Sequence, residues 1–379
     1  MARFISKPAN KALAAAVLSL RICFSVLACF AALGRPATGT EPLVRIGSIP
    51  LKGVEGRLDH LAYDPRSQRL FVAALENHSV EVLDLSRLRR IHRINGVSEP
   101  QGLLYVRQRN RLLVCCRGDG TCRSFDATSF KEGPWVDLGR NADNLRLDSD
   151  GQTVYIGSAG EPGNGLLSAI DITSLVPAEQ GGHPSPPHSP ADFLLDRPRQ
   201  ADPKLELPLG AHPESFQIEP ASHRLLVNVP DERQIVVVQI GARSLTNIAA
   251  WPVTVGEKNF PMAIDTKSER LFVACRKPPA LAVYRAGTGD LLSQTPCVGD
   301  ADDMFYDQRL GRLYVIGGEG FVDVFEVSAD GRRVFVIVHL ATAPRARTGL
   351  FMPELELLAV AAPHTMSHPA EIELYRAKP

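Results

Sequence analysis

One short apolar pattern recurs seven times along this chain of 379 residues, and the repeat limits the fold more than any other feature. Each copy has a turn, a run of apolar residues, a polar turn and a second apolar segment. Successive runs begin 42, 42, 71, 46, 42 and 44 residues apart, close to the ~40–45 residues of a propeller blade. The period therefore predicts a repeat architecture of four strands per copy. The runs begin at Leu70, Leu112, Val154, Leu225, Leu271, Leu313 and Leu357.

The first copy illustrates how one repeat divides into four strands. We expect an inner strand at residues 60–63, strands at 70–74 and 80–83, and an outer strand near 90–94. The run from Leu70 to Ala74 is apolar at every position, which is typical of a strand buried on both faces. The sequence therefore predicts an all-β fold, a seven-bladed β-propeller of four-stranded antiparallel blades around a central channel.

The two ends of the repeat region suggest how the ring closes. A strand-like segment at residues 43–51 precedes the first inner strand, and the last copy ends with a third strand at 371–375 and no outer strand after it. We expect residues 43–51 to supply that missing outer strand, because an open sheet edge promotes aggregation. The propeller would then be a single domain spanning residues 43–376.

Residues 1–34 resemble an export signal or an N-terminal anchor. Arg3, Lys7 and Lys11 form a basic start, and an uninterrupted apolar run covers residues 22–33, shorter than the ~20 residues needed to span a bilayer. Small residues near Gly34 and Gly39 offer cleavage sites. We expect a periplasmic or secreted protein, with membrane contact only through an uncleaved or lipidated N-terminus; lipid attachment at Cys29 remains an alternative.

The long interval between the third and fourth runs contains an insertion. Residues 177–203 are rich in Pro, Gly and His, which is the composition of a loop with extended, polyproline-like stretches. The segment lies between the third strand and the outer strand of the third copy. We therefore expect it to project from the face opposite the channel mouth.

Charge and cysteine content exclude some classes of protein. The chain carries 42 basic and 42 acidic residues, and it becomes mildly acidic without its N-terminal segment, which argues against nucleic acid as a partner. Cys115 and Cys122 would face each other across a hairpin, as a disulfide or as small buried hydrophobic residues. No Cys-x-x-Cys-His motif for haem attachment occurs in the sequence.

The repeat resembles that of the YVTN-type bacterial seven-bladed β-propeller family. Arg69-Leu70-Phe71-Val72, followed by Val80 to Asp84 in the pattern Val-x-Val-x-Asp, carries the resemblance, and Arg312-Leu313-Tyr314-Val315 repeats its first half. Later copies depart from the closing Asp, as at Arg285. The resemblance implies an exported or surface-located binding or scaffold protein, and it carries over no catalytic residues.

The starts of the inner strands are the best candidates for a functional site, because the ring brings them together at one mouth of the channel. The acidic residues among them would create a negative potential there. Carboxylates and histidines in such a set bind a hard cation or a basic ligand; alternatively, Asp and Asn there cap tight turns. The predicted binding residues are Asp59, His60, Gln101, Asp143, Asn144, His212, Glu214, Asp302, Asp303 and Arg347.

These observations favour a scaffold that binds a protein, a small molecule or a polymer through the face carrying the channel mouth. We expect a monomer, no nucleic-acid partner and no firm cofactor, with a divalent cation at the mouth as an open alternative. A metal-assisted lyase or hydrolase, with His60 as general base, is the alternative function, and a redox-partner subunit is a third. We assign no catalytic residue, because the sequence lacks a Gly-rich phosphate loop and a Ser-His-Asp order.

Overall fold

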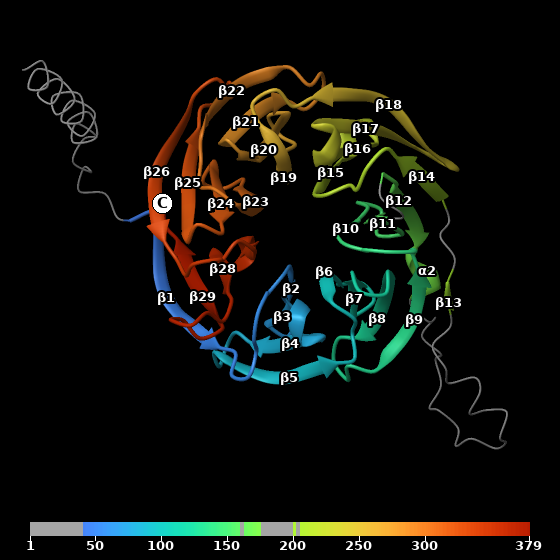
Figure 1. The fold of residues 1–379 in the computed structure, drawn as a ribbon, viewed down its shortest axis with the longest axis vertical. Coiled ribbons are helices and arrows are strands. Elements are labelled where there is room, and N and C mark those ends of the chain that lie inside the picture. Colours follow the sequence, from blue (N-terminus) through green and yellow to red (C-terminus); the bar gives the residue numbers. More distant parts are fainter. Residues whose placement is uncertain (1–40, 160–162, 176–199, 202–204) are drawn as a thin grey trace, which may run out of the picture. The chain divides into compact units, whose positions relative to one another are not determined.

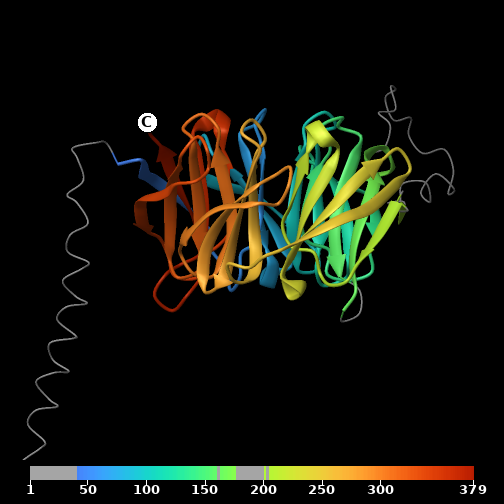
Figure 2. The same cartoon turned by 90° about the horizontal axis from the view of Figure 1, so that it is seen from above.

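Seven antiparallel sheets surround a central channel in the computed structural model, which describes residues 41–159, 163–175, 200–201 and 205–379 (Figure 1). The sheets stand side by side around the channel when the propeller is seen from the edge (Figure 2). The prediction of a seven-bladed, all-β propeller is therefore confirmed. The expected export signal lies outside the described residues. Among the residues that the structure describes, no helix has the length and apolar character needed to cross a membrane.

The first four blades follow one another in chain order. Blade one contains β2 (Leu61–Asp64), β3 (Arg69–Ala74), β4 (Ser79–Asp84) and β5 (Arg89–Asn95). Blade two contains β6 (Pro100–Val106), β7 (Arg111–Cys116), β8 (Thr121–Asp126) and β9 (Glu132–Asp137). Blade three contains β10 (Leu145–Leu147), β11 (Thr153–Ala159), β12 (Gly165–Asp171) and β14 (Leu205–Leu209). Blade four contains β15 (Phe216–Glu219), β16 (Arg224–Val229), β17 (Gln234–Gly241) and β18 (Ser244–Pro252).

The remaining three blades complete the ring. Blade five contains β19 (Glu257–Asp265), β20 (Arg270–Lys277), β21 (Pro279–Arg285) and β22 (Leu291–Pro296). Blade six contains β23 (Ala301–Asp307), β24 (Arg312–Gly317), β25 (Phe321–Val327) and β26 (Val334–Ala341). Blade seven contains β27 (Gly349–Met352), β28 (Leu357–Ala362), β29 (Glu371–Ala377) and β1 (Leu43–Pro50). Short 3₁₀ turns lie between strands at η2 (Leu75–Asn77), η3 (Pro220–Ser222), η4 (Pro230–Glu232) and η5 (Pro353–Leu355).

The hydrophobic core consists of layers between neighbouring blades. In β3, Leu70 and Val72 pack against residues of blade seven, whereas Phe71 and Ala73 pack against residues of blade two such as Leu112. Successive side chains of a strand point to opposite faces, and both faces of this strand are covered. This arrangement explains why the second strand of each repeat has no polar alternation.

Blade seven closes the ring with strands from both ends of the chain. Its order is β1-β29-β28-β27, and β1 pairs antiparallel with β29 from Leu43↔Ala377 to Pro50↔Glu371. Figure 1 shows the blue β1 beside the red β29. The expected closure by the N-terminal strand is confirmed.

Blade two differs from the expected four strands. A fifth strand, β13 (Gln200–Ala201), runs parallel to β9, with Gln200 opposite Trp135. Its two residues belong to the insertion that we expected to be loop throughout, and they cover part of an outer strand that otherwise has a free edge. One helical turn, α2 (Ile172–Leu175), precedes the insertion, and residues 176–199 and 202–204 lie outside the described residues.

The five cysteines in the propeller are free thiols. Cys115 and Cys122 do lie opposite each other in β7 and β8, as the hairpin predicts. Both are fully buried, so they serve as small hydrophobic side chains in the layer between blades two and three.

Candidate ligand site at the channel mouth

The repeat places three acidic residues at equivalent positions just before the inner strands of blades one, three and four. Asp59, Asp143 and Glu214 each donate a backbone N–H to a carbonyl oxygen of the adjacent second strand, at 2.8, 3.0 and 2.9 Å. The backbone carbonyl oxygen of the residue that follows each of them accepts a hydrogen bond from a backbone N–H of the same second strand. The side chains of these three residues therefore start from the same backbone geometry, at one end of the channel.

Bulges bring further side chains to the mouth in blades two, five and six. The pairing of inner and second strands shifts between Pro100 and Leu103, and again between Ala301 and Asp303. A bulge leaves a residue out of the ladder and redirects its side chain. Gln101 and Asp302 lie at these shifts, and both line the cavity at the mouth.

The mouth holds a cavity of about 200 Å³ that unites most of the predicted residues. Eight of the ten predicted binding residues line it; Asp59 lies buried behind Arg57, and Asp303 lines a second cavity farther along the channel. The residues lining the mouth cavity are Arg57, His60, Gln101, Arg117, Asn141, Asp143, Asn144, His212, Glu214, Ser215, Phe260, Arg276, Asp302 and Arg347.

Arginines neutralise much of the acidic charge in one half of the mouth, where the sequence led us to expect a negative potential. Asp302 lies 2.5 Å from Arg276 Nη2, 3.0 Å from Arg347 Nε and 3.9 Å from Arg57 Nη2. Arg57 Nη2 also lies 2.7 Å from Asp59 Oδ2. One half of the mouth is therefore a network of ion pairs. The sequence prediction overlooked Arg57 and Arg276 because neither begins an inner strand.

His60 joins the mouth to the deeper channel. Its Nδ1 lies 3.2 Å from Asp303 Oδ1, and its Nε2 lies 3.6 Å from Asp59 and 3.7 Å from Asp143. Burial lowers the pKa of His60, but Asp303, Asp59 and Asp143 together raise that pKa well above its usual value. The three carboxylates around His60 therefore favour its protonated form, which is the form of a proton donor. Burial raises the pKa of Asp59 to about 7.

The other half of the mouth contains an acidic and imidazole cluster with fewer arginine contacts. His212 Nε2 lies 3.9 Å from both Asp143 Oδ2 and Glu214 Oε1. Burial, and then the charge of Asp143, raise the pKa of Glu214 to about 8. Burial also tends to raise the pKa of Asp143, but hydrogen bonding to His212 and the charge of His60 lower it overall. Asp143 is therefore the ionised carboxylate of this cluster.

Several buried polar atoms at the mouth have no hydrogen-bond partner. Among the described residues, the side-chain oxygens Gln101 Oε1, Asn141 Oδ1 and Asp143 Oδ1 accept no hydrogen bond, and Nδ1 of His212 makes none; Asp143 Oδ1 has only the ion pair with Nε2 of His60 at 3.7 Å. The amide Nε2 of Gln101 donates a hydrogen bond to Asp143 Oδ2 at 2.8 Å. Buried polar groups are normally paired, so these atoms indicate a place for a ligand.

Comparisons with known proteins support the fold. No family model matches the chain, and no curated protein matches it in sequence. Many solved structures share its architecture. One is a chain from a crystal structure of a mitotic checkpoint complex, 12% identical, with a TM-score of 0.66 over 100% of this chain and 98% of that chain. At this identity the similarity shows the fold alone, and the fold is that of a seven-bladed β-propeller.

Proposed function

We propose that this protein is an exported binding scaffold of the YVTN type, and that its ligand occupies the cavity at the channel mouth. The single observation that carries the proposal is that three residues lining one polar cavity, Gln101, Asn141 and Asp143, each hold a buried side-chain oxygen that accepts no hydrogen bond from the described residues. Leaving a buried acceptor unpaired costs about 1–3 kcal/mol, and a ligand that donates hydrogen bonds removes that cost.

Turn-capping acids elsewhere in the propeller behave differently from those at the mouth. Asp84 Oδ1 accepts backbone bonds from Ser86 and Arg87 at 2.9 and 3.1 Å, and Asp126 Oδ1 accepts one from Thr128 at 3.0 Å. These residues satisfy their own turns, as short polar side chains commonly do. Among the described contacts, Asp143 makes no such bond to its own turn. The turn-capping interpretation therefore explains the repeat's closing Asp, and it also fits Asp59, whose Oδ1 accepts the backbone N–H of His60 at 3.1 Å; it does not explain Asp143.

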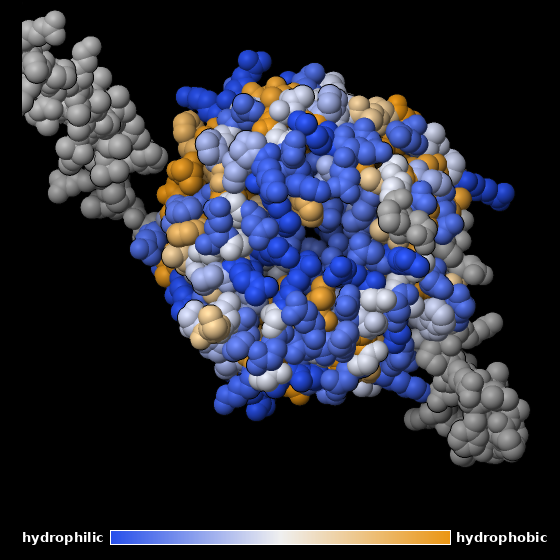
Figure 3. All heavy atoms as spheres, viewed as in Figure 1, coloured by the Kyte–Doolittle hydropathy of each residue, from blue (hydrophilic) through white to orange (hydrophobic). Residues whose placement is uncertain are grey.

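The unbonded oxygens favour a ligand that carries a positive charge or several N–H donors. Asp143 supplies an ionised carboxylate, and a cation at the mouth would favour ionisation of Glu214 as well. The cavity of about 200 Å³ suits one side-chain-sized group, such as an inserted lysine or arginine side chain or a small amine. Figure 3 shows a largely hydrophilic propeller face, consistent with polar recognition.

A binding titration tests this proposal directly. The probes are agmatine and spermidine, followed by calorimetry and by thermal shift, since a ligand that binds only the native state raises its melting temperature. We expect one saturable site that weakens about tenfold or more in Asp143→Asn. Asp231→Asn is the matched control, because Asp231 is an exposed acid whose ion pair among the described residues is with Lys258. Equal binding by Asp143→Asn and Asp231→Asn would refute the mouth as the site.

Export is tested separately by fractionation of cells that produce the full chain. We expect the protein in the periplasm or the medium, shortened by removal of residues near the N-terminus. Protein of full length in the cytoplasm would contradict export without affecting the binding proposal.

A metal-assisted lyase or hydrolase is the second candidate, and one observation favours it. Asp143, His212 and Glu214 offer ligand atoms that all lie within 4.8 Å of one another. One imidazole and two carboxylates suit zinc or manganese. If the site holds a metal, His60, whose Nε2 lies 3.7 Å from Asp143, would be the nearby imidazole for proton transfer. Stoichiometric Mn²⁺ binding that His212→Ala abolishes would support this candidate; binding of amines alone, with no turnover, would support the scaffold.

A further inference from the structure

A second, larger cavity occupies the channel beyond His60. It measures about 440 Å³, and residues of all seven inner strands line it. It shares His60, Asn144 and Ser215 with the mouth cavity, and its far end reaches Pro65 and Glu354 in the turns that follow two inner strands. The two cavities therefore follow one another along the channel, and the second lies toward the face opposite the mouth.

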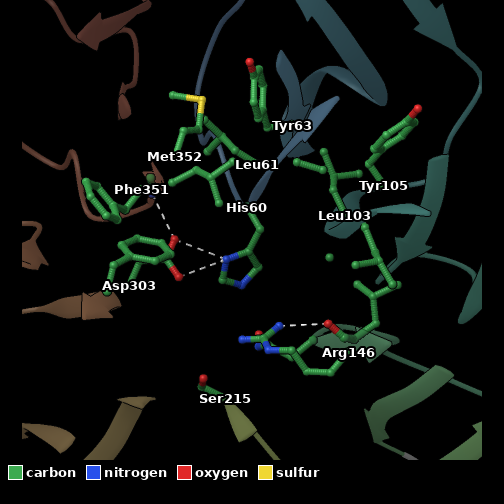
Figure 4. Close-up of a pocket in the computed structure, with 18 of the residues that line it drawn as sticks. His60, Leu61, Tyr63, Leu103, Tyr105, Arg146, Ser215, Asp303, Phe351 and Met352 are labelled. Atoms are coloured by element: carbon green, nitrogen blue, oxygen red, sulfur yellow. Dashed lines mark hydrogen bonds and ion pairs between the residues drawn. The ribbon is translucent and has the colours of Figure 1, made fainter. Parts of the chain in front are cut away.

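The wall of this inner cavity combines an apolar part with a polar part of similar extent. Leu61, Leu103, Met304, Phe351 and Met352 are all buried residues that line it. Figure 4 shows four of them, Leu61, Leu103, Phe351 and Met352, around the space that His60 borders. A volume of this size lies within the range of small-molecule sites, which are mostly apolar with a few placed polar groups.

Arg146 is the charged group that this wall leaves without a carboxylate partner. Its Nη1 donates to the carbonyl oxygen of its own neighbour Leu145 at 2.8 Å, and its Cζ lies 5.7 Å from the ring centroid of Phe216. Among the residues that the structure describes, no carboxylate oxygen lies within salt-bridge distance of its guanidinium. In Figure 4 the guanidinium points into the cavity, below His60.

Other arginines of the propeller show what a structural role requires. Arg270, which is 5% exposed, places Nη2 2.6 Å from Asp265 Oδ2 and donates Nη1 to a backbone carbonyl. A buried guanidinium is costly unless it is paired, and its planar fork matches a carboxylate. Arg146 is only partly buried, but it lacks such a pair among the described residues and lines a cavity with a large apolar part, so an anion that enters the cavity would be its partner.

We propose that the inner cavity binds an amphipathic monoanion, with its head on Arg146 and its hydrophobic body along the wall formed by Leu61, Leu103 and Phe351. A medium-chain carboxylate has this chemistry. A single negative charge is favoured because Asp143 and Asp303 already act on Arg146 from longer range and would repel a dianion. This site is separate from the mouth site and does not depend on a ligand there.

Calorimetric titration with sodium decanoate, below its critical micelle concentration, tests the proposal on the purified full chain. We expect one site per chain and a higher melting temperature. Arg146→Met removes the charge and keeps an apolar side chain, and it should weaken decanoate binding about tenfold or more, since charge-assisted pairs are the strong ones. Decanol has the same hydrophobic body without the charge, so its weaker binding should not fall in Arg146→Met.

Three results would overturn the proposal. They are no saturable decanoate binding, equal affinity in Arg146→Met, and equal affinity for decanoate and decyltrimethylammonium. Circular dichroism and the melting temperature establish that each variant is folded. If Arg146→Met does not fold, Phe351→Ala tests the contact with the ligand's hydrophobic body, and Arg146→Lys tests the contact with its carboxylate. Glu214→Gln, in the mouth, should leave decanoate affinity within about twofold, so failure of either site is distinguishable from failure of the other.

Discussion

The Nη2 atom of Arg276 lies 2.5 Å from Oδ1 of Asp302, and the two residues belong to neighbouring blades, five and six. Arg347, just before the inner strand of blade seven, and Arg57, just before that of blade one, contact the same carboxylate. One buried carboxylate therefore connects four consecutive parts of the ring at the mouth.

Removing this carboxylate should destabilise the whole propeller. Asp302→Asn leaves three arginines with a neutral partner in a largely buried place, and we expect a loss of about 2–4 kcal/mol in the free energy of unfolding. Asp300→Asn is the control, because Asp300 also contacts Arg276 and Arg347 but its side chain is 43% exposed, and it should cost less than about 1 kcal/mol. Urea denaturation measures both, and equal losses would contradict the network.

The protein should be less stable at pH 8 than at pH 6. Burial raises the pKa of Asp59 to about 7 and that of Glu214 to about 8, and the pKa of His60 is also raised. The native state therefore keeps protons that the unfolded chain has released, so the free energy of unfolding falls as pH rises through this window. We expect a fall on the order of a few kcal/mol between pH 6 and 8.

A variant identifies the source of this pH dependence. Glu214→Gln cannot ionise, so its stability should change less with pH than that of the wild type. Urea midpoints at pH 6, 7 and 8 supply the comparison. Stability that increases with pH over this range would contradict the assignment.

The packing behind the mouth should be sensitive to a single methyl group. A Cβ added at Gly102 would collide with the carbonyl oxygen of Asp143 in the adjacent blade. Gly102→Ala should therefore cost about 1–3 kcal/mol and weaken binding of amines at the mouth, because Asp143 must move. Gly287→Ala is the control, since a Cβ there meets nothing within 4 Å, and it should be neutral or slightly stabilising. Thermal melts and the agmatine titration report both effects.

The fold was predictable because each repeat contains the turn residues and the apolar runs that form the strands of one blade. Turn residues separate runs such as Arg69 to Ala74, and the structure makes each such run a second strand. The pairing of β13 with β9 was not predictable, because Gln200 and Ala201 lie in a Pro-rich insertion without a strand pattern. A two-residue strand that forms only because tertiary structure brings it beside β9 is too short to show a periodic pattern in the sequence.

The site was predictable where the repeat itself places the residue. Asp59, Asp143 and Glu214 follow from their common position before an inner strand. Arg276 could not be found this way, because it ends a second strand, in a position that resembles a solvated turn. Arg146 lies within an inner strand, and only the packed channel reveals that its charge lacks a carboxylate partner among the described residues.

Closure of blade seven by β1 should account for a large share of the stability, and two isoleucines of this strand allow a matched test. Ile49 is fully buried in the core layer between blades seven and one, whereas Ile46 is 46% exposed. Ile49→Ala should cost about 2–4 kcal/mol, because it removes buried methyl groups and leaves a cavity, while Ile46→Ala should change stability by less than about 0.5 kcal/mol.

Deletion of residues 43–50 goes further, because it exposes the hydrogen-bonding edge of β29 and opens the ring, so we expect an aggregating or loosely folded product. Urea midpoints and size-exclusion chromatography measure these outcomes. If the deletion left the melting temperature and the monomeric elution unchanged, the N-terminal strand would not be the element that closes the ring.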